Sequence, residues 1–403
     1  MKNKICKFYD LIVLGAGITG LSVARQKMLD EPDCKVLIIE KESKIGMHGS
    51  GRNSGVLHSG IYYPSDTLKA KFCAEGSTLM TNYCKERNLS IVRCGKVILP
   101  TTIEGEDQIN LLYKRGVENG ASVEIISQQE LSEIEPEANT MAKNFLYSPN
   151  TSVVDPCEIL NKIQTELRAL NVTFLFNEKV MLANPDLSTI KTYKNNNFKY
   201  GHLINCTGQH SDVVSKIFNV GKKYTSLPFK GTYYGLNKKS KIRLNGLIYP
   251  VPDLNTPFLG VHSVKLVDGE IFFGPTAIPA FGRENYYGIK DINIKDAASI
   301  SYHLLRQYIS NKQGFREYAH QESSKFLKSE FLKSIQGLIP NLVSDDLVPS
   351  KKVGIRAQLL NKDCNELVMD FVVERVDNTT HVLNAVSPAF TSAFSFAKYI
   401  LNK

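Results

Sequence analysis

The sequence predicts an α/β fold, α+β overall, in which a domain on a parallel sheet is interleaved along the chain with a domain on an antiparallel sheet. Two observations lead to this prediction. The chain opens with a strand, a helix and a second strand, and both strands are nearly continuous apolar runs. Residues 224–281, by contrast, form short β-rich runs interrupted by glycine and proline. A chain of 403 residues is long enough for two or three domains.

The N-terminal strand–helix–strand unit predicts a Rossmann-type dinucleotide site. Gly15, Gly17 and Gly20 form GxGxxG directly between the first strand and the helix. The first glycine makes the turn, the second admits a pyrophosphate at the helix N-terminus, and the third lets the helix pack on the strand. Glu40 ends the second strand, where a carboxylate accepts hydrogen bonds from ribose hydroxyls and disfavours a ribose phosphate.

Three later segments favour FAD over a nicotinamide dinucleotide. The stretch 46–63 is rich in Gly, Ser and Asn and can lie flat against a planar ligand. The segment 202–208 (HLINCTG) is a strand that runs into Thr-Gly, and 387–394 (SPAFTSAF) precedes a helix whose N–H groups would stabilise a reduced flavin. From these segments we expect the following residues at the cofactor: Arg52, Asn53, Ser54, Gly55, Thr207, Gly208, Pro388, Thr391 and Ser392.

The remaining elements divide between two discontinuous domains. Strands are expected at 9–14, 35–40, 96–99, 172–176, 202–206, 366–373 and 381–384. Helices are expected at 18–30, 68–87, 105–119, 157–170, 296–309, 323–335 and about 391–401. We assign residues 1–88, 150–222 and 350–403 to the FAD-binding domain, and residues 89–149 and 223–349 to the substrate-binding domain.

Composition argues against several other classes of protein. The eight cysteines are scattered without CxxC pairs, which predicts reduced thiols and no metal site. The N-terminal apolar run is too short for a signal peptide, and no stretch approaches the ~20 apolar residues of a membrane span, so we expect a soluble, unprocessed, cytoplasmic chain. The formal charge of +9 comes from dispersed lysines, which favours a hydrated surface over nucleic-acid binding.

Longer segments resemble a known family. They are RNSGVLHSGIYY (52–63), CGKVILP (94–100), IYPVPDLNTPFLGVHS (248–263), GPTAIPAFGRENY (274–286), GIRAQ (354–358) and HVLNAVSPAFTSAF (381–394). Together they resemble the L-2-hydroxyglutarate oxidase or dehydrogenase family within the D-amino-acid-oxidase superfamily of FAD oxidoreductases. The resemblance implies oxidation of a small 2-hydroxy acid, and quinone, oxygen or a carrier protein as electron acceptor. A quinone would imply peripheral contact with the inner face of a membrane.

Three positions depart from the pattern of the family. Arg52 stands where His is expected, Thr232 where Glu is usual, and Thr276 where Asn is usual. These polar changes fall in segments expected near the flavin or the substrate, so they leave the identity of the substrate open.

The expected reaction transfers a hydride from the substrate Cα to flavin N5 while a base takes the hydroxyl proton. Arg356 is predicted to clamp the substrate carboxylate, because a guanidinium offers two parallel hydrogen bonds and related oxidases use an arginine at the matching place. His58 is the favoured base and His262 the second candidate. Tyr233 and Tyr234 are candidates for the wall of the substrate pocket.

Several alternatives stay open at this point. Arg356 could form a surface ion pair, either histidine could be a structural hydrogen-bond partner, and the two tyrosines could be ordinary core. The chain could instead be an amine, amino-acid or glycerol-3-phosphate oxidoreductase of the same superfamily. A non-catalytic FAD-fold protein that binds nucleic acid is supported by the net charge alone.

Overall fold

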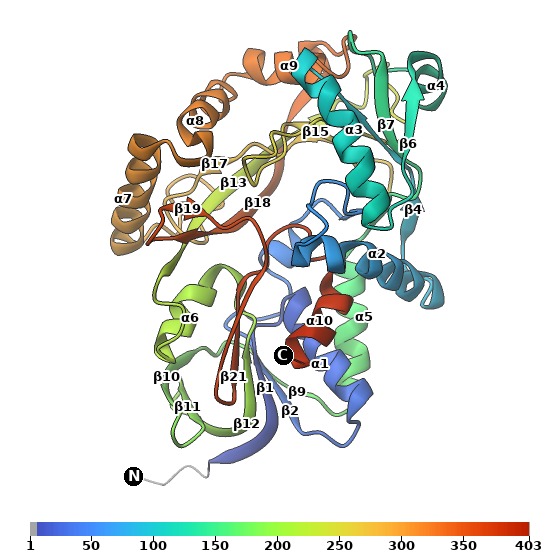
Figure 1. The fold of residues 1–403 in the computed structure, drawn as a ribbon. Coiled ribbons are helices and arrows are strands. Elements are labelled where there is room, and N and C mark those ends of the chain that lie inside the picture. The colour runs from blue at the N-terminus through green and yellow to red at the C-terminus, as the bar shows by residue number, and fades with distance from the viewer. Residues whose placement is uncertain (1–5, 403) are drawn as a thin grey trace. The chain divides into compact units, whose positions relative to one another are not determined.

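The structure of the chain, a computed structural model, describes residues 6–402 and divides the chain into two compact units, each discontinuous in sequence (Figure 1). Unit 1 comprises Met1–Arg52, Pro156–Pro228 and Arg356–Lys403. Unit 2 comprises Asn53–Asp155 and Phe229–Ile355. Among residues 6–402 we find no helix with the length and hydropathy needed to cross a lipid bilayer.

Unit 1 is built on an eight-stranded sheet whose central strands are parallel. Its path is β10-β11-β12-β1-β2-β9, with β21 beside β12 and β20 beside β21. The parallel strands are β1 (Lys7–Leu14), β2 (Val36–Ile39), β9 (Thr173–Leu175), β12 (Asn197–Asn205) and β21 (Thr379–Asn384). Antiparallel hairpins add β10 (Val180–Asn184), β11 (Thr189–Thr192) and β20 (Val372–Val376).

Four helices accompany this sheet. They are α1 (Ile18–Asp30), α5 (Pro156–Ala169), α6 (Ser211–Ile217) and α10 (Ala393–Asn402). In α5 the buried side chains are Ile159, Leu160, Ile163 and Leu167, which recur at helical spacing. Helix α1 packs against both α5 and α10, so the first and last helices of the chain are neighbours (Figure 1).

Unit 2 contains three sheets. The largest runs β15-β16-β13-β18, with β17 also on β13; its strands are β13 (Tyr224–Leu236), β15 (His262–Lys265), β16 (Ile271–Gly274), β17 (Ile278–Pro279) and β18 (Leu347–Asn361). The second runs β14-β5-β7-β6, with strands Leu247–Pro250, Lys96–Leu99, Asn144–Ser148 and Glu124–Ser127. The third pairs β3 (Val56–Leu57), β8 (Ser152–Val154) and β4 (Ile91–Arg93). The chain re-enters unit 1 along β18, whose last residues pair with β19 (Glu366–Leu367).

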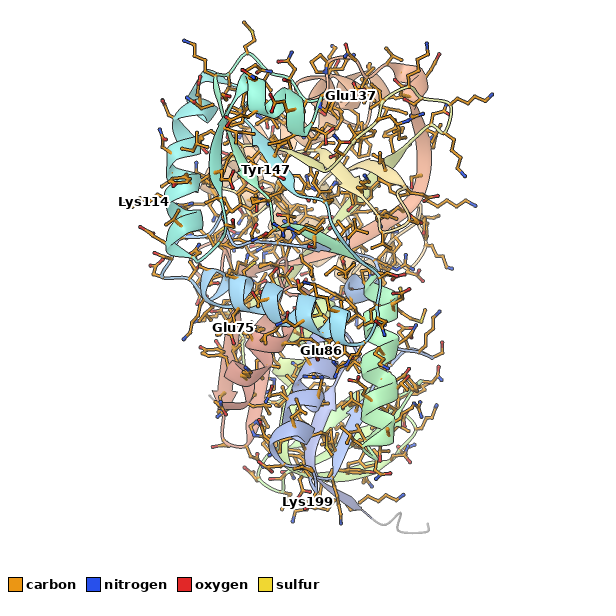
Figure 2. All side chains as sticks on the ribbon, turned by 90° about the vertical axis from the view of Figure 1, so that its right-hand side faces the viewer. Glu75, Glu86, Lys114, Glu137, Tyr147 and Lys199 are labelled. Carbon is orange, nitrogen blue, oxygen red and sulfur yellow. The ribbon has the colours of Figure 1, made fainter. Side chains whose placement is uncertain are left out.

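The helices of unit 2 are α2 (Leu68–Glu86), α3 (Ile103–Glu118), α4 (Gln128–Ile134), α7 (Ile294–Ser310), α8 (Phe315–Ser324) and α9 (Lys328–Gln336). Charged side chains such as Glu75 and Glu86 of α2 and Lys114 of α3 are exposed, as Figure 2 illustrates. Thr67 and Thr102 cap the N-termini of α2 and α3 by accepting hydrogen bonds from the backbone N–H three residues later.

The structure confirms the Rossmann-type unit and the mixed α/β class but differs from three expectations. Strand β14 pairs in parallel with β5, so residues 224–281 do not form one antiparallel sheet. The helix expected at 323–335 is two helices, because Leu327 has an extended backbone (φ −81°, ψ 125°). The strand expected at 366–373 is likewise two short strands, β19 and β20.

The bounds of the units differ from those of the expected domains chiefly at residues 53–88. The sequence division places this segment in the first domain, whereas it belongs to unit 2 by contact. The reason is hydrophobic packing: Val56, Ile61 and Tyr62 share a buried cluster with Ile98 and Leu146. The functional roles assigned to the two domains stay predictions.

Candidate functional site

The turn between β1 and α1 fits only glycine at two of its three motif positions. Gly15 has φ +98°, and a Cβ there would lie 2.6 Å from the Cys206 carbonyl oxygen. A Cβ on Gly20 would lie 2.0 Å from the Gly15 carbonyl oxygen, which is closer than any real contact. The first glycine therefore makes the turn and the third lets α1 pack on β1, as the motif predicts.

The N-terminus of α1 points into a loop rich in small residues. Its N-cap is Gly17, which offers no side chain, and its first turn carries no acidic residue. The N–H of Ile18 donates to Oγ of Ser50 (2.9 Å), and a Cβ on Gly17 would lie 2.9 Å from that same oxygen. The N–H groups of the first helical turn and the positive end of the helix dipole make this terminus suitable for a phosphate. Sequence reasoning did not single out Ser50, although the surrounding GSG was a sign of close backbone approach.

Glu40 is fixed beside the glycine turn. Its Oε2 accepts a hydrogen bond from the Ala16 N–H (2.7 Å), and its Oε1 accepts one from the Glu42 N–H (2.9 Å). The side chain is buried at the carboxyl end of β2. Two charge-assisted bonds therefore hold the carboxylate where the motif expects a ribose partner.

Thr207 and Gly208 follow β12 at the same edge of the sheet. Oδ1 of Asn205 accepts hydrogen bonds from both the N–H and the hydroxyl of Thr207 (3.2 and 2.6 Å), and Gly208 has φ +54°. Because β1, β2 and β12 are parallel neighbours, the residues that follow them gather at one edge. Ligands of open α/β sheets bind at this carboxyl edge.

The C-terminal segment places Pro388, Thr391 and Ser392 in the turn just before α10. The N–H of Ser392 donates to the Pro388 carbonyl (3.0 Å), and the side chains of Thr391 and Ser392 are buried. The Ser392 hydroxyl has no hydrogen-bond partner among the residues that the structure describes. A buried hydroxyl without a partner is the kind of group that a bound ligand satisfies.

These features fit a dinucleotide. The glycine turn excludes side chains, the helix terminus offers N–H groups, Glu40 offers a carboxylate and Ser392 an unsatisfied hydroxyl. Arg52 is tied to the same loop, since its Nε donates to the Met47 carbonyl (2.9 Å). Of the expected site residues, unit 1 holds Gly15, Gly17, Gly20, Glu40, Arg52, Thr207, Gly208, Arg356, Pro388, Thr391 and Ser392, and unit 2 holds Asn53, Ser54, Gly55, His58, Tyr233, Tyr234 and His262.

The loop that carries His58 is fastened to unit 2 on both sides. The Cys73 thiol donates to the His58 carbonyl (3.3 Å), and the hydroxyls of Ser59 and Ser148 are hydrogen-bonded (2.9 Å). The side-chain amide of Asn119 donates to the Gly60 carbonyl (2.9 Å). The backbone at His58 is thus held by α2, β7 and the end of α3, which is what a positioned base requires.

His262 begins β15 and is buried. Its Nδ1 lies 2.7 Å from the Gly260 carbonyl oxygen, which can only accept, so Nδ1 carries a proton. In the neutral ring the basic nitrogen is then Nε2. The imidazole also stacks on the ring of Tyr249, with centroids 3.8 Å apart and planes at 25°.

The two tyrosines of β13 differ in their surroundings. Successive residues of a strand face opposite sides of the sheet. Tyr234 packs against Phe331 in the core, with ring centroids 4.8 Å apart. Tyr233 is buried as well, and Nζ of Lys352 lies 5.9 Å from its ring centroid. Tyr234 therefore has the surroundings of a core residue, and Tyr233 remains the candidate for a pocket wall.

Two of the three departures from the family pattern contact each other. The hydroxyls of Thr232 and Thr276 are 2.9 Å apart, and the Thr232 N–H also donates to the Thr276 hydroxyl (3.1 Å). The Thr276 N–H in turn donates to the Thr232 carbonyl (3.2 Å). The two changes thus form one hydrogen-bonded pair.

Arg356 lies in β18 and is half-buried.

Comparison with known proteins agrees with this architecture. The mitochondrial L-2-hydroxyglutarate dehydrogenase of Nematostella vectensis is 34% identical over 421 residues, covering 98% of this chain and 90% of the relative. The L-2-hydroxyglutarate dehydrogenase of Escherichia coli strain K12 is 31% identical, covering 98% and 93%. In fold, the chain is similar to the FAD-bound L-alpha-glycerophosphate oxidase of Mycoplasma pneumoniae, with a TM-score of 0.77 and 19% identity over 98% of this chain and 94% of that one. A sequence model of the family DAO, FAD dependent oxidoreductase, matches residues 10–402. The chain therefore belongs to this family of FAD dependent oxidoreductases.

Proposed function

We propose that this FAD-dependent enzyme oxidises L-2-hydroxyglutarate to 2-oxoglutarate. The observation that carries the proposal is the similarity, at 31–34% identity along nearly the whole chain, to relatives that bear the name L-2-hydroxyglutarate dehydrogenase. Since such similarity covers the segments 52–63, 248–263 and 354–358 as well as the cofactor motif, it supports a shared substrate and not the cofactor alone.

Unit 1 supplies the FAD-binding domain in this proposal. Gly15, Gly17 and the N-terminus of α1 receive the pyrophosphate, and Glu40 accepts hydrogen bonds from the ribose. The remaining predicted contacts are Arg52, Thr207, Gly208, Pro388, Thr391 and Ser392 of unit 1, together with Asn53, Ser54 and Gly55, which belong to unit 2 by contact. FAD, when bound, supplies the acceptor for the hydride that leaves the substrate Cα.

The protein's own side chains hold the substrate and move its proton. Arg356 clamps the carboxylate next to the reacting carbon, since a guanidinium binds a carboxylate through two parallel bonds. His58 accepts the hydroxyl proton, and the contacts that fasten its loop support this role. His262 is the second candidate, through the Nε2 that the Gly260 contact leaves basic. Tyr233 lines the pocket.

The electron acceptor is a quinone, oxygen or a carrier protein, and we further propose peripheral contact with the inner face of a membrane, where a quinone would be reached. The support is the exposed face of α7, where Ile294, Tyr302, Leu305 and Ile309 are 86, 58, 58 and 67% exposed. Their spacing places them in one stripe along the helix, beside Lys295 and Arg306. A surface helix with an apolar stripe and flanking cations is suited to an anionic lipid surface.

Anaerobic reduction of the flavin tests the substrate. The purified enzyme is mixed without oxygen with L-2-hydroxyglutarate, D-2-hydroxyglutarate, L-lactate, glycerol 3-phosphate or glycine. Reduction of the flavin is followed as the loss of the visible absorbance band of oxidised flavin, at about 450 nm. Of these five compounds, we expect only L-2-hydroxyglutarate to bleach the flavin rapidly. Bleaching by glycerol 3-phosphate or glycine, without bleaching by L-2-hydroxyglutarate, would refute the proposal.

Vesicle sedimentation tests the membrane contact. Wild type is expected to sediment with vesicles containing anionic phospholipid and to stay in solution with zwitterionic ones. The double variant Leu305→Glu/Ile309→Glu should lose this binding, because it places two like charges against the lipid surface. Val117→Glu is the matched control, since Val117 is an exposed apolar residue of α3, away from the α7 stripe. Equal binding by all three proteins would contradict the assignment.

A further inference from the structure

A lysine lies inside the hydrophobic core of unit 2. Lys96 begins β5 and is 1% exposed. Its strand neighbours are Leu247 on one side and Ser148 on the other. Lysine is almost never fully buried unless it is paired. An ammonium group without a partner at this position would therefore be unusual.

Two aromatic rings surround this ammonium group. Its Nζ lies 4.8 Å from the ring centroid of Tyr62 and 5.3 Å from that of Tyr249. Within residues 6–402, no carboxylate forms an ion pair with it and no side chain accepts a hydrogen bond from it. Burial lowers the pKa of Lys96 to about 8, so the amine is still mostly protonated at neutral pH. The core thus holds a positive charge without a countercharge.

The nearby thiols do not supply that countercharge. Burial raises the pKa of Cys73 to about 12 and that of Cys94 to about 11, so both are neutral at physiological pH. Cation–π contact with two rings offsets part of the cost of burying an ammonium, but a ring does not accept its N–H groups as an anion does.

Two unsatisfied hydroxyls belong to the same cluster. Tyr62 and Tyr249 are buried, and in the described part of the chain neither phenolic O–H has a hydrogen-bond partner. Buried polar groups are satisfied in nearly all native structures. Lys96 and the two tyrosines thus present three hydrogen-bond donors, none of which has an acceptor among the described residues. An anion with several oxygens is the kind of acceptor that these donors lack.

The cluster is connected to both candidate bases. Tyr62 follows His58 in the same loop. The Cys73 thiol donates to the His58 carbonyl, and the nearby charge of Lys96 lowers the pKa of this thiol, although burial outweighs that effect. Tyr249 stacks directly on the imidazole of His262. All of these residues belong to unit 2. A ligand that reaches the donors therefore lies near the proposed proton-transfer groups.

We propose that Lys96, Tyr62 and Tyr249 bind the second carboxylate of a dicarboxylate substrate, the one remote from the carbon that is oxidised. The inference rests on the proposed function and deepens it, because it names the groups that distinguish a five-carbon dicarboxylate from a monocarboxylate. The anion receives a charge-assisted bond from the lysine and one neutral bond from each tyrosine.

Binding of unreactive acids tests the site without catalysis. Glutarate carries two carboxylates and butyrate one, and neither has a hydroxyl to oxidise. Titration calorimetry on the FAD-loaded wild type is expected to show glutarate binding more tightly than butyrate. Lys96→Met, which keeps the length and apolar volume of the side chain, should weaken glutarate about tenfold or more, as loss of one charged hydrogen bond implies. Its affinity for butyrate should change less than about threefold.

Kinetics supply the second readout. For Lys96→Met we expect KM for L-2-hydroxyglutarate to rise about tenfold, while kcat/KM for L-2-hydroxybutyrate stays near the wild-type value. The double variant Tyr62→Phe/Tyr249→Phe should weaken the binding of glutarate by a smaller factor. It replaces the lysine variant in this test if Lys96→Met does not fold. Lys69→Met is the matched control: Lys69 is also buried in unit 2 and also lies over a ring, that of Tyr63 (5.6 Å). It should leave the ratio of glutarate to butyrate affinity unchanged.

The outcomes separate this inference from the proposed function. If wild type oxidises L-2-hydroxyglutarate while Lys96→Met and the tyrosine variant bind glutarate like wild type, the inference is wrong and the function stands. If glutarate binding depends on Lys96 but L-2-hydroxyglutarate is not oxidised, the dicarboxylate site stands and the function is wrong. An equal loss of affinity for glutarate and for butyrate in the variants would also overturn the inference, because it would show that the substitutions disturb unit 2 in general.

Discussion

Replacing Lys96 by methionine should make the protein more stable at neutral pH. Burial lowers the pKa of Lys96 from 10.5 in a free side chain to about 8. One pKa unit corresponds to about 1.4 kcal/mol of difference between protonation states, so the buried ammonium costs the folded state on the order of 3 kcal/mol. Met has similar length and no charge, and it should remove most of that cost. We therefore expect Lys96→Met to unfold with a free energy about 2–3 kcal/mol higher than wild type at pH 7.

The sign of the pH dependence follows from linkage. Below pH 8 the amine is protonated in both the folded and unfolded chain, so the cost is present in full. Between pH 8 and 10.5 the unfolded chain binds more protons than the folded one, so wild-type stability rises with pH relative to the variant. The advantage of Lys96→Met should therefore shrink from about 2–3 kcal/mol at pH 7 to below about 1 kcal/mol at pH 10.

Urea unfolding measures this difference. Because the chain has no tryptophan, far-UV circular dichroism is a better probe than intrinsic fluorescence. Unfolding midpoints of wild type, Lys96→Met and the exposed control Lys114→Met are compared at pH 7 and 10, with excess FAD in every sample. A variant less stable than wild type at pH 7, or an advantage that does not change with pH, would refute the picture of an uncompensated buried charge.

Two further predictions concern unit 1. Gly20→Ala should abolish FAD retention and destabilise the protein by about 1–3 kcal/mol or more, because its Cβ would lie 2.0 Å from the Gly15 carbonyl oxygen. Gly49→Ala is the control, since a Cβ there meets nothing within 4 Å; the ratio of flavin to protein absorbance reports the result, and equal loss in both variants would contradict the packing argument. Arg356→Lys should raise KM for L-2-hydroxyglutarate about tenfold or more while FAD remains bound, because lysine loses the bidentate geometry, and an unchanged KM would assign Arg356 to structure instead.

The sequence allowed the Rossmann-type unit to be predicted because its determinants are local. The apolar run at 9–14, the helical spacing at 18–30 and the glycine motif lie within about 30 consecutive residues, and the strand and helix bounds agree closely with β1 and α1. Glu40 could be placed for the same reason, since its distance from the motif is fixed by one helix and one strand.

The cluster around Lys96 could not be predicted because its determinants are not local. CGKVILP predicts a strand at 96–99, but nothing in it says that the first residue is covered from every side. The covering residues, Tyr62 and Tyr249, come from distant segments, and Tyr249 arrives through the parallel pairing of β14 with β5. The pairing of Thr232 with Thr276 likewise joins segments 44 residues apart. Such contacts depend on strand order, which periodicity does not encode.

The discontinuity of both units has a consequence for biosynthesis. The chain crosses between the units four times, and the segment from Arg356 onward, which is made after the other two segments of unit 1, contributes β21 and α10 to that unit. Strand β21 pairs with β12, and α10 packs on α1. The sheet of unit 1 and the packing on α1 therefore cannot be completed until the segment from Arg356 onward has been made, although the glycine turn is made more than 300 residues earlier.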